Sequence, residues 1–305
     1  MCISFSILCL SYLQYNLFSN QIQIKKRNNT IIIGVIDLIS KYKIKLVVLL
    51  GDRFEILAVS QVCLILGLET CHLAGGDITL GALDDKFRNA ITQLSTYHFP
   101  TCEKSKNNLL KMNIPDNKIK VLGNPGLEIF VDYKPVLSKE EIKKRFNIND
   151  YILIVFHPET NNKNTEYINH FFNGINKSKF QKVIIQSNCD PGYQEIIENY
   201  RKEYVLINNL KRDEYLSLAY HSKYYVGNSS SGIYELPYLN IPIINVGDRQ
   251  KGRKISNNTH ESTFENLQNK IILLEENIND NILNCDNNYK IYQSKKIFID
   301  FLNYI

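Results

Sequence analysis

Residues 45–58 read KLVVLLGDRFEILA, which is an aliphatic run, a glycine-led polar turn and the start of a second apolar segment. An unbroken run of Val and Leu is typical of a strand buried on both faces, as in a parallel sheet. Residues 55–66 have the length and apolar content of a helix. The stretch therefore predicts a strand, a tight turn and a helix that packs back on the strand.

The same alternation continues along the rest of the chain. We expect further strands at 96–99, 119–122, 151–156, 182–186, 204–207, 223–226 and 241–246. Helices are expected between them at 81–95, 102–112, 165–176, 193–201, 211–221 and from 231. In the helix at 81–95 the apolar residues share one stripe, which leaves Asp84, Asp85 and Arg88 nearer the polar flank. Strands joined by helical crossovers form parallel sheets with helices on both faces, so the predicted fold class is α/β, with two doubly wound, Rossmann-like domains.

The domain boundary is expected in the segment VDYKPVLS at 131–138, which combines a proline with polar residues. It is followed by Ser138 and Glu141, spaced as in a capping box that starts a new helix. We therefore assign residues 1–134 to the first domain and residues 135–288 to the second.

The composition is that of an ordinary soluble globular protein. The 305 residues include 36 Lys+Arg and 31 Asp+Glu, which gives a net charge of +5, and 44% are hydrophobic. So much apolar surface excludes intrinsic disorder. The Lys residues are scattered without a basic run, so we expect no nucleic-acid partner. The seven cysteines form no CxxC pair, which favours reduced thiols in or near the cores.

The N-terminal segment 2–18, CISFSILCLSYLQYNLF, is apolar enough to suggest a signal peptide or a membrane anchor. No Lys or Arg precedes it, no small-residue cleavage site follows, and Gln14, Asn16 and several Ser interrupt it. We therefore expect a buried or ragged first element, a cytoplasmic protein and no membrane partner.

Four polar loops follow predicted strands: GDR at 51–53, HLAGGDIT at 72–79, HPET at 157–160 and GNSSSG at 227–232. Ligands of doubly wound sheets bind outside the carboxyl ends of the strands. GNSSSG offers backbone N–H groups, hydroxyls and a helix N-terminus to a phosphate, with Glu235 placed to accept from a ribose diol and Arg249 able to supply positive charge. The same turn also occurs wherever a helix simply needs an N-cap.

Acid/base chemistry has its own candidates in these loops. The carboxylates Asp52, Asp77 and Asp84 and the imidazole of His157 all fall at or just after predicted strand ends. Each of them, taken singly, could equally be a cap or a salt-bridge partner. Their convergence on one edge of the sheets favours a catalytic site.

Taken together, these loops resemble the hydrolysing UDP-N-acetylglucosamine 2-epimerases, the family that opens sialic-acid and legionaminic-acid biosynthesis. The resemblance runs from about Asn29 to Arg253. Its motifs are LLGDRFEILA at 49–58, HLAGGDITLGALDD at 72–85, FRNAITQLSTYHF at 87–99, VLGNPGLE at 121–128, FHPET at 156–160, SNCDPG at 187–192, VGNSSSGIYELP at 226–237 and NVGDRQKGR at 245–253. The resemblance implies the two-domain fold called GT-B, and residues 289–305 would be the last helix, which crosses back to the first domain.

The resemblance also implies a reaction without metal or cofactor. UDP is eliminated to leave a 2-acetamido glycal, and water then adds to give the free 2-epimeric sugar. Asp52 and Asp84 would be the catalytic carboxylates, and His157 would act at the diphosphate or as an acid. Asp77 is assigned to the catalytic site with them. The UDP contacts would be Arg53, Asn188, Ser229, Ser230, Glu235 and Arg249. A homo-oligomer, dimer or tetramer, is expected.

The chain departs from the family pattern in several places. Ala74 stands where several members have Glu or His, so Asp77 is the acidic residue left in that loop, and Asn89 and Gln93 replace the more frequent His and Lys. The form HLAGGD is similar to that of members acting on UDP-N,N′-diacetylbacillosamine, so both this sugar and UDP-N-acetylglucosamine are candidate substrates.

The larger departure is at the front of the chain. Only 44 residues precede Lys45, without the Gly-x-Arg strand and loop of the family, so the first domain is expected to be incomplete and truncated at its N-terminus. A truncated, non-catalytic relative that binds UDP-sugars is therefore an alternative. A GT-B glycosyltransferase is a weaker one, because the GDR and HLAGGD loops have no role in generic sugar transfer.

Overall fold

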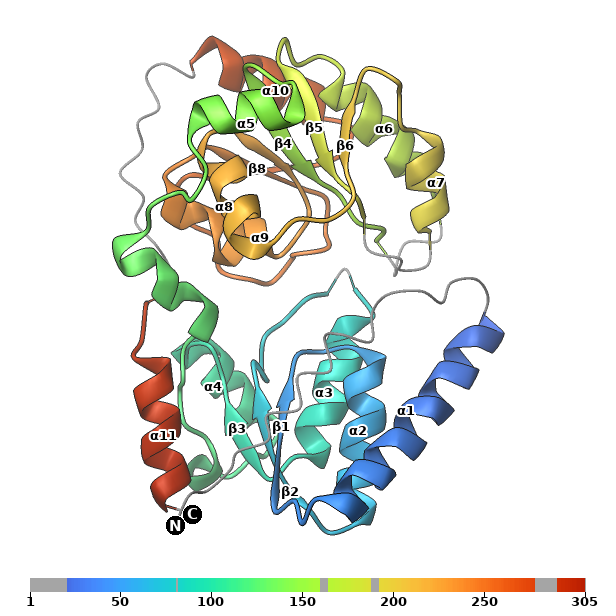
Figure 1. The fold of residues 1–305 in the computed structure, drawn as a ribbon, viewed down its shortest axis with the longest axis vertical. Coiled ribbons are helices and arrows are strands. Elements are labelled where there is room, and N and C mark those ends of the chain that lie inside the picture. Colours follow the sequence, from blue (N-terminus) through green and yellow to red (C-terminus); the bar gives the residue numbers. More distant parts are fainter. Residues whose placement is uncertain (1–20, 81, 160–163, 188–191, 278–289, 305) are drawn as a thin grey trace. The chain divides into compact units, whose positions relative to one another are not determined.

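The computed structural model describes residues 21–80, 82–159, 164–187, 192–277 and 290–304. The chain divides into two compact units (Figure 1). Unit 1 comprises Met1–Asp77, Asp84–Pro125 and Tyr292–Ile305, and unit 2 comprises Ile78–Leu83 and Gly126–Ile291. No helix in the described part of the chain is both long enough and apolar enough to cross a membrane.

Unit 1 is built on a parallel sheet of three strands in the described residues, in the order β1 (Leu46–Leu50), β2 (Glu69–Leu73), β3 (Tyr97–Phe99). Its helices are α1 (Gln21–Lys41), α2 (Phe54–Ile65), α3 (Asp84–Leu94), α4 (Glu103–Lys111) and α11 (Ser294–Tyr304). The predicted strand at 119–122 forms only an isolated bridge between Ile119 and His98. Two residues of the predicted loop at 72–79, His72 and Leu73, lie within β2.

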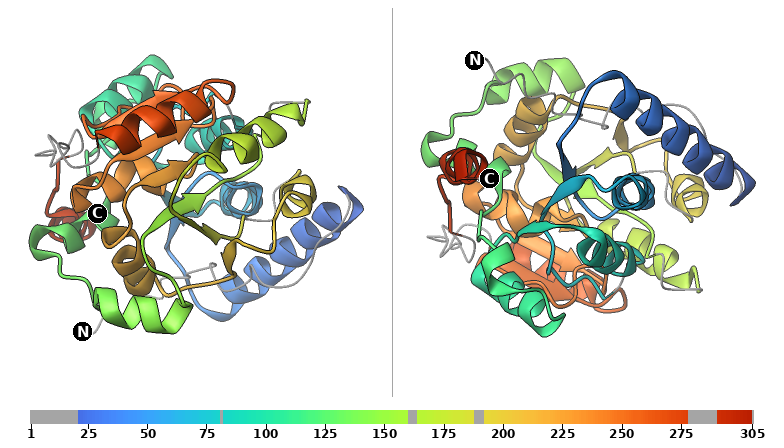
Figure 2. Two further views of the ribbon diagram at one scale, coloured as in Figure 1. Left: turned by 90° about the horizontal axis from the view of Figure 1, so that it is seen from above. Right: turned by 90° about the horizontal axis from the view of Figure 1, so that it is seen from below.

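Separate apolar clusters cover the two faces of this sheet. On one face Leu49 packs with Val35 of α1 and Val59 of α2. On the other face Phe99 packs against Phe298 and Phe301 of α11, with ring centroids 5.2 and 4.8 Å apart. Figure 2 shows α1 and α2 on one side of the strands and α11 on the other. Helices therefore pack on both sides of β1, but β1 is an edge strand of the described sheet, so it is less buried than its sequence predicts: only Leu49 is fully buried, and Leu50 is 64% exposed.

In the described residues of unit 2, six parallel strands lie in the order β6-β5-β4-β7-β8-β9. They are β4 (Tyr151–Val155), β5 (Gln181–Ile185), β6 (Val205–Ile207), β7 (Tyr225–Gly227), β8 (Ile243–Val246) and β9 (Thr259–Ser262). Numbered within the unit the order is 3-2-1-4-5-6, which is that of the Rossmann fold. The chain winds outward from β4 to one edge and returns to β7 to wind toward the other edge. The topological switch point is thus at the carboxyl ends of the paired strands β4 and β7, outside which such sheets bind ligands.

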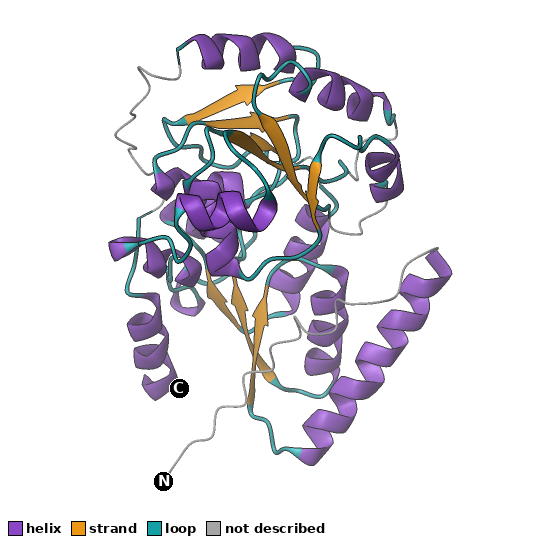
Figure 3. Ribbon diagram, turned by 45° about the horizontal axis from the view of Figure 1, so that its top comes forward, coloured by secondary structure: helices purple, strands orange, loops and turns teal. Residues whose placement is uncertain are grey.

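Helices lie on both sides of the unit 2 strands (Figure 3). They are α5 (Lys139–Phe146), α6 (Glu166–Ile175), α7 (Tyr193–Glu198), α8 (Arg212–Tyr220), α9 (Ser231–Tyr234) and α10 (Leu267–Glu276). The predicted capping box is present at the start of α5, because Ser138 Oγ accepts from the Glu141 N–H at 3.2 Å and Glu141 Oε2 accepts from the Ser138 N–H at 2.8 Å. The prediction of an α/β fold with two Rossmann-like units built on parallel sheets is confirmed, and in the described residues the reversal of strand order of a doubly wound sheet is seen in unit 2.

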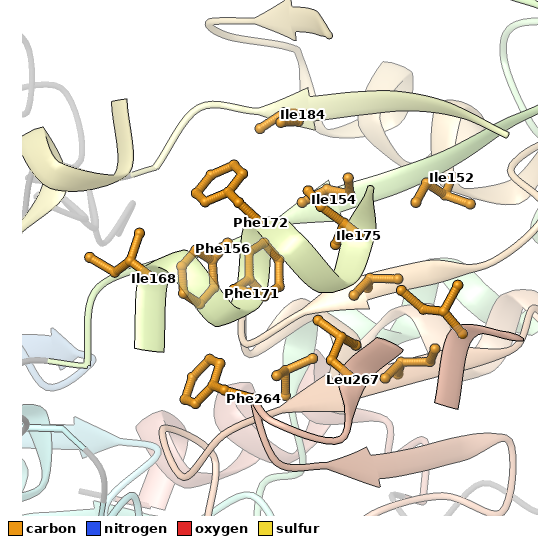
Figure 4. Close-up of a cluster of buried hydrophobic side chains, with 14 of the residues drawn as sticks. Ile152, Ile154, Phe156, Ile168, Phe171, Phe172, Ile175, Ile184, Phe264 and Leu267 are labelled. Carbon is orange, nitrogen blue, oxygen red and sulfur yellow. The ribbon is translucent and has the colours of Figure 1, made fainter. Parts of the chain in front are cut away.

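An extended apolar cluster of unit 2 packs β4 against α6 and α10 (Figure 4). Phe156, directly after β4, stacks on Phe171 of α6 with ring centroids 3.8 Å apart. The rings of Phe264 and Phe156 pack edge to face, with their centroids 6.0 Å apart. Phe156 immediately precedes His157, so this buried stack anchors the carboxyl end of β4 at the switch point.

Candidate active site

Unit 1 has a polar centre around the guanidinium of Arg88 on α3. This side chain is buried, with only 1% of the residue exposed. Its Nη1 donates to the carbonyl oxygen of Asp77 at 2.9 Å and to Asp85 Oδ1 at 3.2 Å, and its Nη2 pairs with Asp52 Oδ2. A buried guanidinium stays charged and needs such partners. Arg88 therefore holds the loops after β1 and β2 against the start of α3.

His72 of β2 fixes the turn that carries Asp52. Its Nε2 lies 3.1 Å from the carbonyl oxygen of Gly51, and its Nδ1 lies 3.1 Å from Thr92 Oγ1. Because a carbonyl oxygen can only accept, Nε2 carries the proton and the Thr92 hydroxyl donates to Nδ1. Burial lowers the pKa of His72 to about 4, so the ring is neutral at pH 7. The ring thus holds Gly51, whose φ of +98° suits glycine, directly before the carboxylate.

This arrangement predicts that unit 1 loses stability in mild acid. The pKa of His72 is about 4 in the folded protein and 6.5 for an unperturbed histidine, so the unfolded chain takes up the proton first as the pH falls. The free energy of unfolding should therefore decrease by roughly 1–2 kcal/mol between about pH 7 and pH 5. The pKa of buried His98 is also lowered to about 4, which adds a loss in the same direction.

Urea unfolding of the His72→Gln variant at the two pH values checks this prediction. Glutamine keeps a donor and an acceptor but does not titrate, so roughly half of the acid-induced loss should disappear. An acid dependence identical to that of the unchanged chain would contradict it.

The other two predicted carboxylates of unit 1 have different surroundings. Asp77 is buried, and its Oδ1 accepts from Thr101 Oγ1 at 3.0 Å and from the Ser105 hydroxyl. Asp84 is the first residue of α3 and is partly exposed, at the helix end that favours negative charge. The contacts of Asp77 favour a positioning role, whereas Asp84 and Asp52 retain solvent access.

Unit 2 has a second polar centre, which lies at the switch point. A Cβ on Gly227 would lie 2.0 Å from the carbonyl oxygen of Val155, so the ends of β7 and β4 approach closely. The next residue, Asn228, is fully buried. Its Oδ1 accepts from the His157 N–H at 2.8 Å, and its Nδ2 donates to the His157 carbonyl oxygen at 2.8 Å. These two hydrogen bonds attach the backbone of the candidate acid His157 to the start of the GNSSSG turn.

The loop after β8 is tied to the same place. The Asn228 carbonyl oxygen accepts from Gln250 Nε2 at 2.8 Å and from Arg249 Nη1 at 3.2 Å. The carboxylate of Glu159 accepts from the backbone N–H groups of Asp248 and Arg249. Three loops at neighbouring strand ends, after β4, β7 and β8, are therefore connected by buried and partly buried hydrogen bonds.

The hydroxyls of the GNSSSG turn are partly exposed and lie beside the buried Tyr225 and the partly buried Tyr215. Tyr225 accepts from the Ser229 N–H at 3.3 Å, and the Tyr215 hydroxyl lies 2.7 Å from Ser231 Oγ. One turn further on, Glu235 Oε1 accepts from Arg212 Nε at 3.1 Å and from Arg212 Nη2 at 2.8 Å. The carboxylate that is the candidate ribose acceptor is thus held in one orientation.

The sequence-predicted site residues fall into two groups. Asp52, Arg53, Asp77 and Asp84 lie around the polar centre of unit 1, and His157, Ser229, Ser230, Glu235 and Arg249 lie at the switch point of unit 2. Asn188 lies outside the described residues. Within the described ranges, no group of three or more His, Cys, Asp or Glu side chains could hold a metal ion.

Sequence reasoning missed Arg88, His72, Asn228 and Glu159 as parts of these centres, although all four lie inside the quoted motifs. The helical stripe put Arg88 near the polar flank of α3, but the structure buries it. The sequence did contain a signal for the role of Arg88. It is a charged residue one turn after the pair Asp84 and Asp85, in a helix that follows a polar loop.

Comparison with known proteins identifies the family of the chain. A family model described as UDP-N-acetylglucosamine 2-epimerase matches residues 2–303. The GDP/UDP-N,N′-diacetylbacillosamine 2-epimerase (hydrolyzing) of Campylobacter jejuni is 35% identical over 252 residues, which are 78% of this chain and 65% of that protein. The UDP-N,N′-diacetylbacillosamine 2-epimerase (hydrolyzing) of Legionella pneumophila is 32% identical over 70% of this chain and 58% of its own length. The chain thus spans less than two thirds of these relatives.

A solved structure shares the fold. The UDP-GlcNAc 2-epimerase from Neisseria meningitidis bound to UDP-GlcNAc superimposes with a TM-score of 0.78 at 21% identity, over 95% of this chain and 84% of that one. The fold is therefore of the GT-B type found in these enzymes. The family model matches almost the whole length of the chain, and the sequence motifs are those of the same family. The chain therefore belongs to the UDP-N-acetylglucosamine 2-epimerase family.

Proposed function

We propose that this chain is a hydrolysing UDP-amino-sugar 2-epimerase. It would convert UDP-N-acetylglucosamine or UDP-N,N′-diacetylbacillosamine and water into UDP and the free 2-epimeric amino sugar, at the start of sialic-acid or legionaminic-acid formation. The observation that carries the proposal is the buried Arg88, which holds Asp52 and Asp85 at the ends of β1 and α3. A generic sugar transferase needs no such carboxylate centre, whereas removal of a carbon-bound proton needs a positioned base.

The unit 2 centre supplies the groups that a departing UDP needs. The hydroxyls of Ser229 and Ser230 would donate to phosphate oxygens, and Arg249 would neutralise part of their charge. The Glu235 carboxylate, oriented by Arg212, would accept from the ribose hydroxyls. His157 would donate a proton or a hydrogen bond to the diphosphate as the bond to the sugar breaks. Arg53 and Asn188 complete the proposed UDP contacts.

The unit 1 centre would carry the carbon chemistry. In the first step Asp52 or Asp84 takes the proton from carbon 2 while the carbon 1–oxygen bond to UDP breaks, which leaves the 2-acetamido glycal. In the second step water adds its hydroxyl to carbon 1, and carbon 2 receives a proton on the opposite face. Asp77 would keep the loop after β2 in place through Thr101 and Ser105. We also propose a cytoplasmic homo-oligomer that uses no metal or cofactor.

A UDP-release assay tests the proposal. The purified chain is incubated with each of the two UDP-sugars, and UDP is separated from UDP-sugar by ion exchange. We expect UDP release from one or both substrates and its loss in the Asp52→Asn variant, by about 100-fold or more. UDP binding without release, abolished by Glu235→Ala, would support the non-catalytic alternative. Transfer of the sugar to an acceptor would support the glycosyltransferase.

A further inference from the structure

Glu159 places a buried carboxylate at the end of β4, beside the loops proposed to bind a diphosphate. The residue is 6% exposed, and burial raises the pKa of its side chain. A negative charge near an anion site weakens anion binding, so a carboxylate at this position calls for another role. The contacts of Glu159 give that role.

The carboxylate holds the backbone of the loop after β8. Its Oε1 accepts from the Asp248 N–H at 2.7 Å and from the Arg249 N–H at 3.0 Å. The turn is packed directly onto this oxygen, because a Cβ on Gly247 would lie 2.3 Å from it. Tyr167 of α6 accepts from the Glu159 N–H at 3.0 Å, so the clamp is itself attached to the apolar core.

Arg249 is consequently fixed at two points, its own N–H to Glu159 and its Nη1 to the Asn228 carbonyl oxygen at 3.2 Å. An arginine that is already ordered loses less conformational entropy when it binds phosphate. We propose that Glu159 is a positioning residue that sets the affinity for the UDP diphosphate by holding the Asp248–Arg249 backbone, so that Arg249 is in place before UDP binds. This inference rests on the proposed function, because it takes Arg249 to contact the diphosphate.

Titration calorimetry of the full chain with UDP and with uridine tests it. We expect Glu159→Ala to weaken UDP binding by about 10-fold, because two N–H groups lose their acceptor and Arg249 its position. Glu159→Gln keeps an acceptor oxygen and should restore most of the affinity. Uridine lacks the diphosphate, so its affinity should change by less than about 2-fold in either variant.

A double-mutant cycle separates action through Arg249 from a general loss of structure. In an Arg249→Ala background, Glu159→Ala should weaken UDP binding by no more than about 2-fold further. If Glu159→Ala unfolds, Glu159→Asp replaces it, since it keeps the charge but shortens the reach by one methylene.

Glu275→Ala is the matched control. This carboxylate accepts from the Tyr224 hydroxyl at 2.6 Å and from the Ser178 hydroxyl, close to the amino ends of β7 and β5. It should leave UDP affinity within about 2-fold. Three results would overturn the inference. The effects of Glu159→Ala and Arg249→Ala on UDP affinity could be additive, Glu159→Gln could lose as much affinity as Glu159→Ala, or Glu275→Ala could lose as much affinity as Glu159→Ala. Absence of UDP binding by the unchanged chain would overturn the proposed function together with it.

Discussion

Replacing Arg88 with methionine is expected to lower kcat by about 100-fold or more and the free energy of unfolding of unit 1 by about 3 kcal/mol. The side chain is 1% exposed and joins Asp52, Asp85 and the Asp77 carbonyl oxygen. Its loss leaves two partly buried carboxylates without their shared cation, which is costlier than losing an exposed ion pair. The rate falls because Asp52 no longer has one fixed position.

Urea unfolding and the UDP-release assay check this prediction. Arg88→Lys keeps the charge but cannot bridge three acceptors, so it should give an intermediate rate. Arg145→Met is the control, since the exposed Arg145–Glu214 pair, 2.7 Å long, should contribute less than about 1 kcal/mol and leave kcat unchanged. A kcat for Arg88→Met within about 3-fold of the unchanged chain would show that the buried arginine has no part in the reaction.

Replacing Asn228 with alanine is expected to weaken UDP binding by about 30-fold and to cost about 2–3 kcal/mol of stability. The side chain supplies both hydrogen bonds to the His157 backbone, each 2.8 Å long, in a fully buried position. Alanine removes both of these hydrogen bonds from the partly buried His157 backbone. It also releases the FHPET loop from the GNSSSG turn, so the proposed phosphate ligands lose their common frame.

Asn258→Ala provides the matched control for this experiment. Asn258 is also fully buried in unit 2, and its Nδ2 donates to the carbonyl oxygens of Ile241 at 3.0 Å and Pro237 at 3.3 Å. It precedes β9 and lies near the amino ends of the strands. We expect a comparable loss of stability, measured by urea unfolding, with UDP affinity within about 2-fold by calorimetry. Equal losses of affinity in both variants would show that Asn228 acts only through stability.

Much of the fold could be predicted from the sequence because local patterns determine it. The aliphatic runs at 45–50, 151–156 and 182–186 all form parallel strands, and the Ser138–Glu141 spacing starts α5. These features depend on neighbours within a few residues. The run at 119–122 has similar composition but forms only one bridge, to His98. Whether this run forms a strand depends on the hydrogen-bonding groups of β3 beside it, and the local sequence pattern holds no information on them.

The sequence predicted where the polar centres lie but only some of the residues that form them. Loops at the carboxyl ends of parallel strands hold Asp52, His157 and Ser229, as the sheet topology requires. The burial of Arg88 depends on Asp52, 36 positions away in the chain, and the role of Asn228 depends on His157, 71 positions away. Such pairs form only when the strands are in register, so residue type and spacing cannot reveal them.

The most direct test of the central claim is an NMR experiment in D2O. The chain is incubated with UDP-N-acetylglucosamine and, separately, with UDP-N,N′-diacetylbacillosamine, and the products are followed over time. Elimination followed by hydration predicts UDP and a free amino sugar of inverted configuration, with one deuterium at carbon 2. An intact UDP-sugar that gains deuterium or changes configuration at carbon 2 without releasing UDP would contradict the hydrolysing reaction, and a UDP-sugar that stays unchanged would contradict the activity altogether.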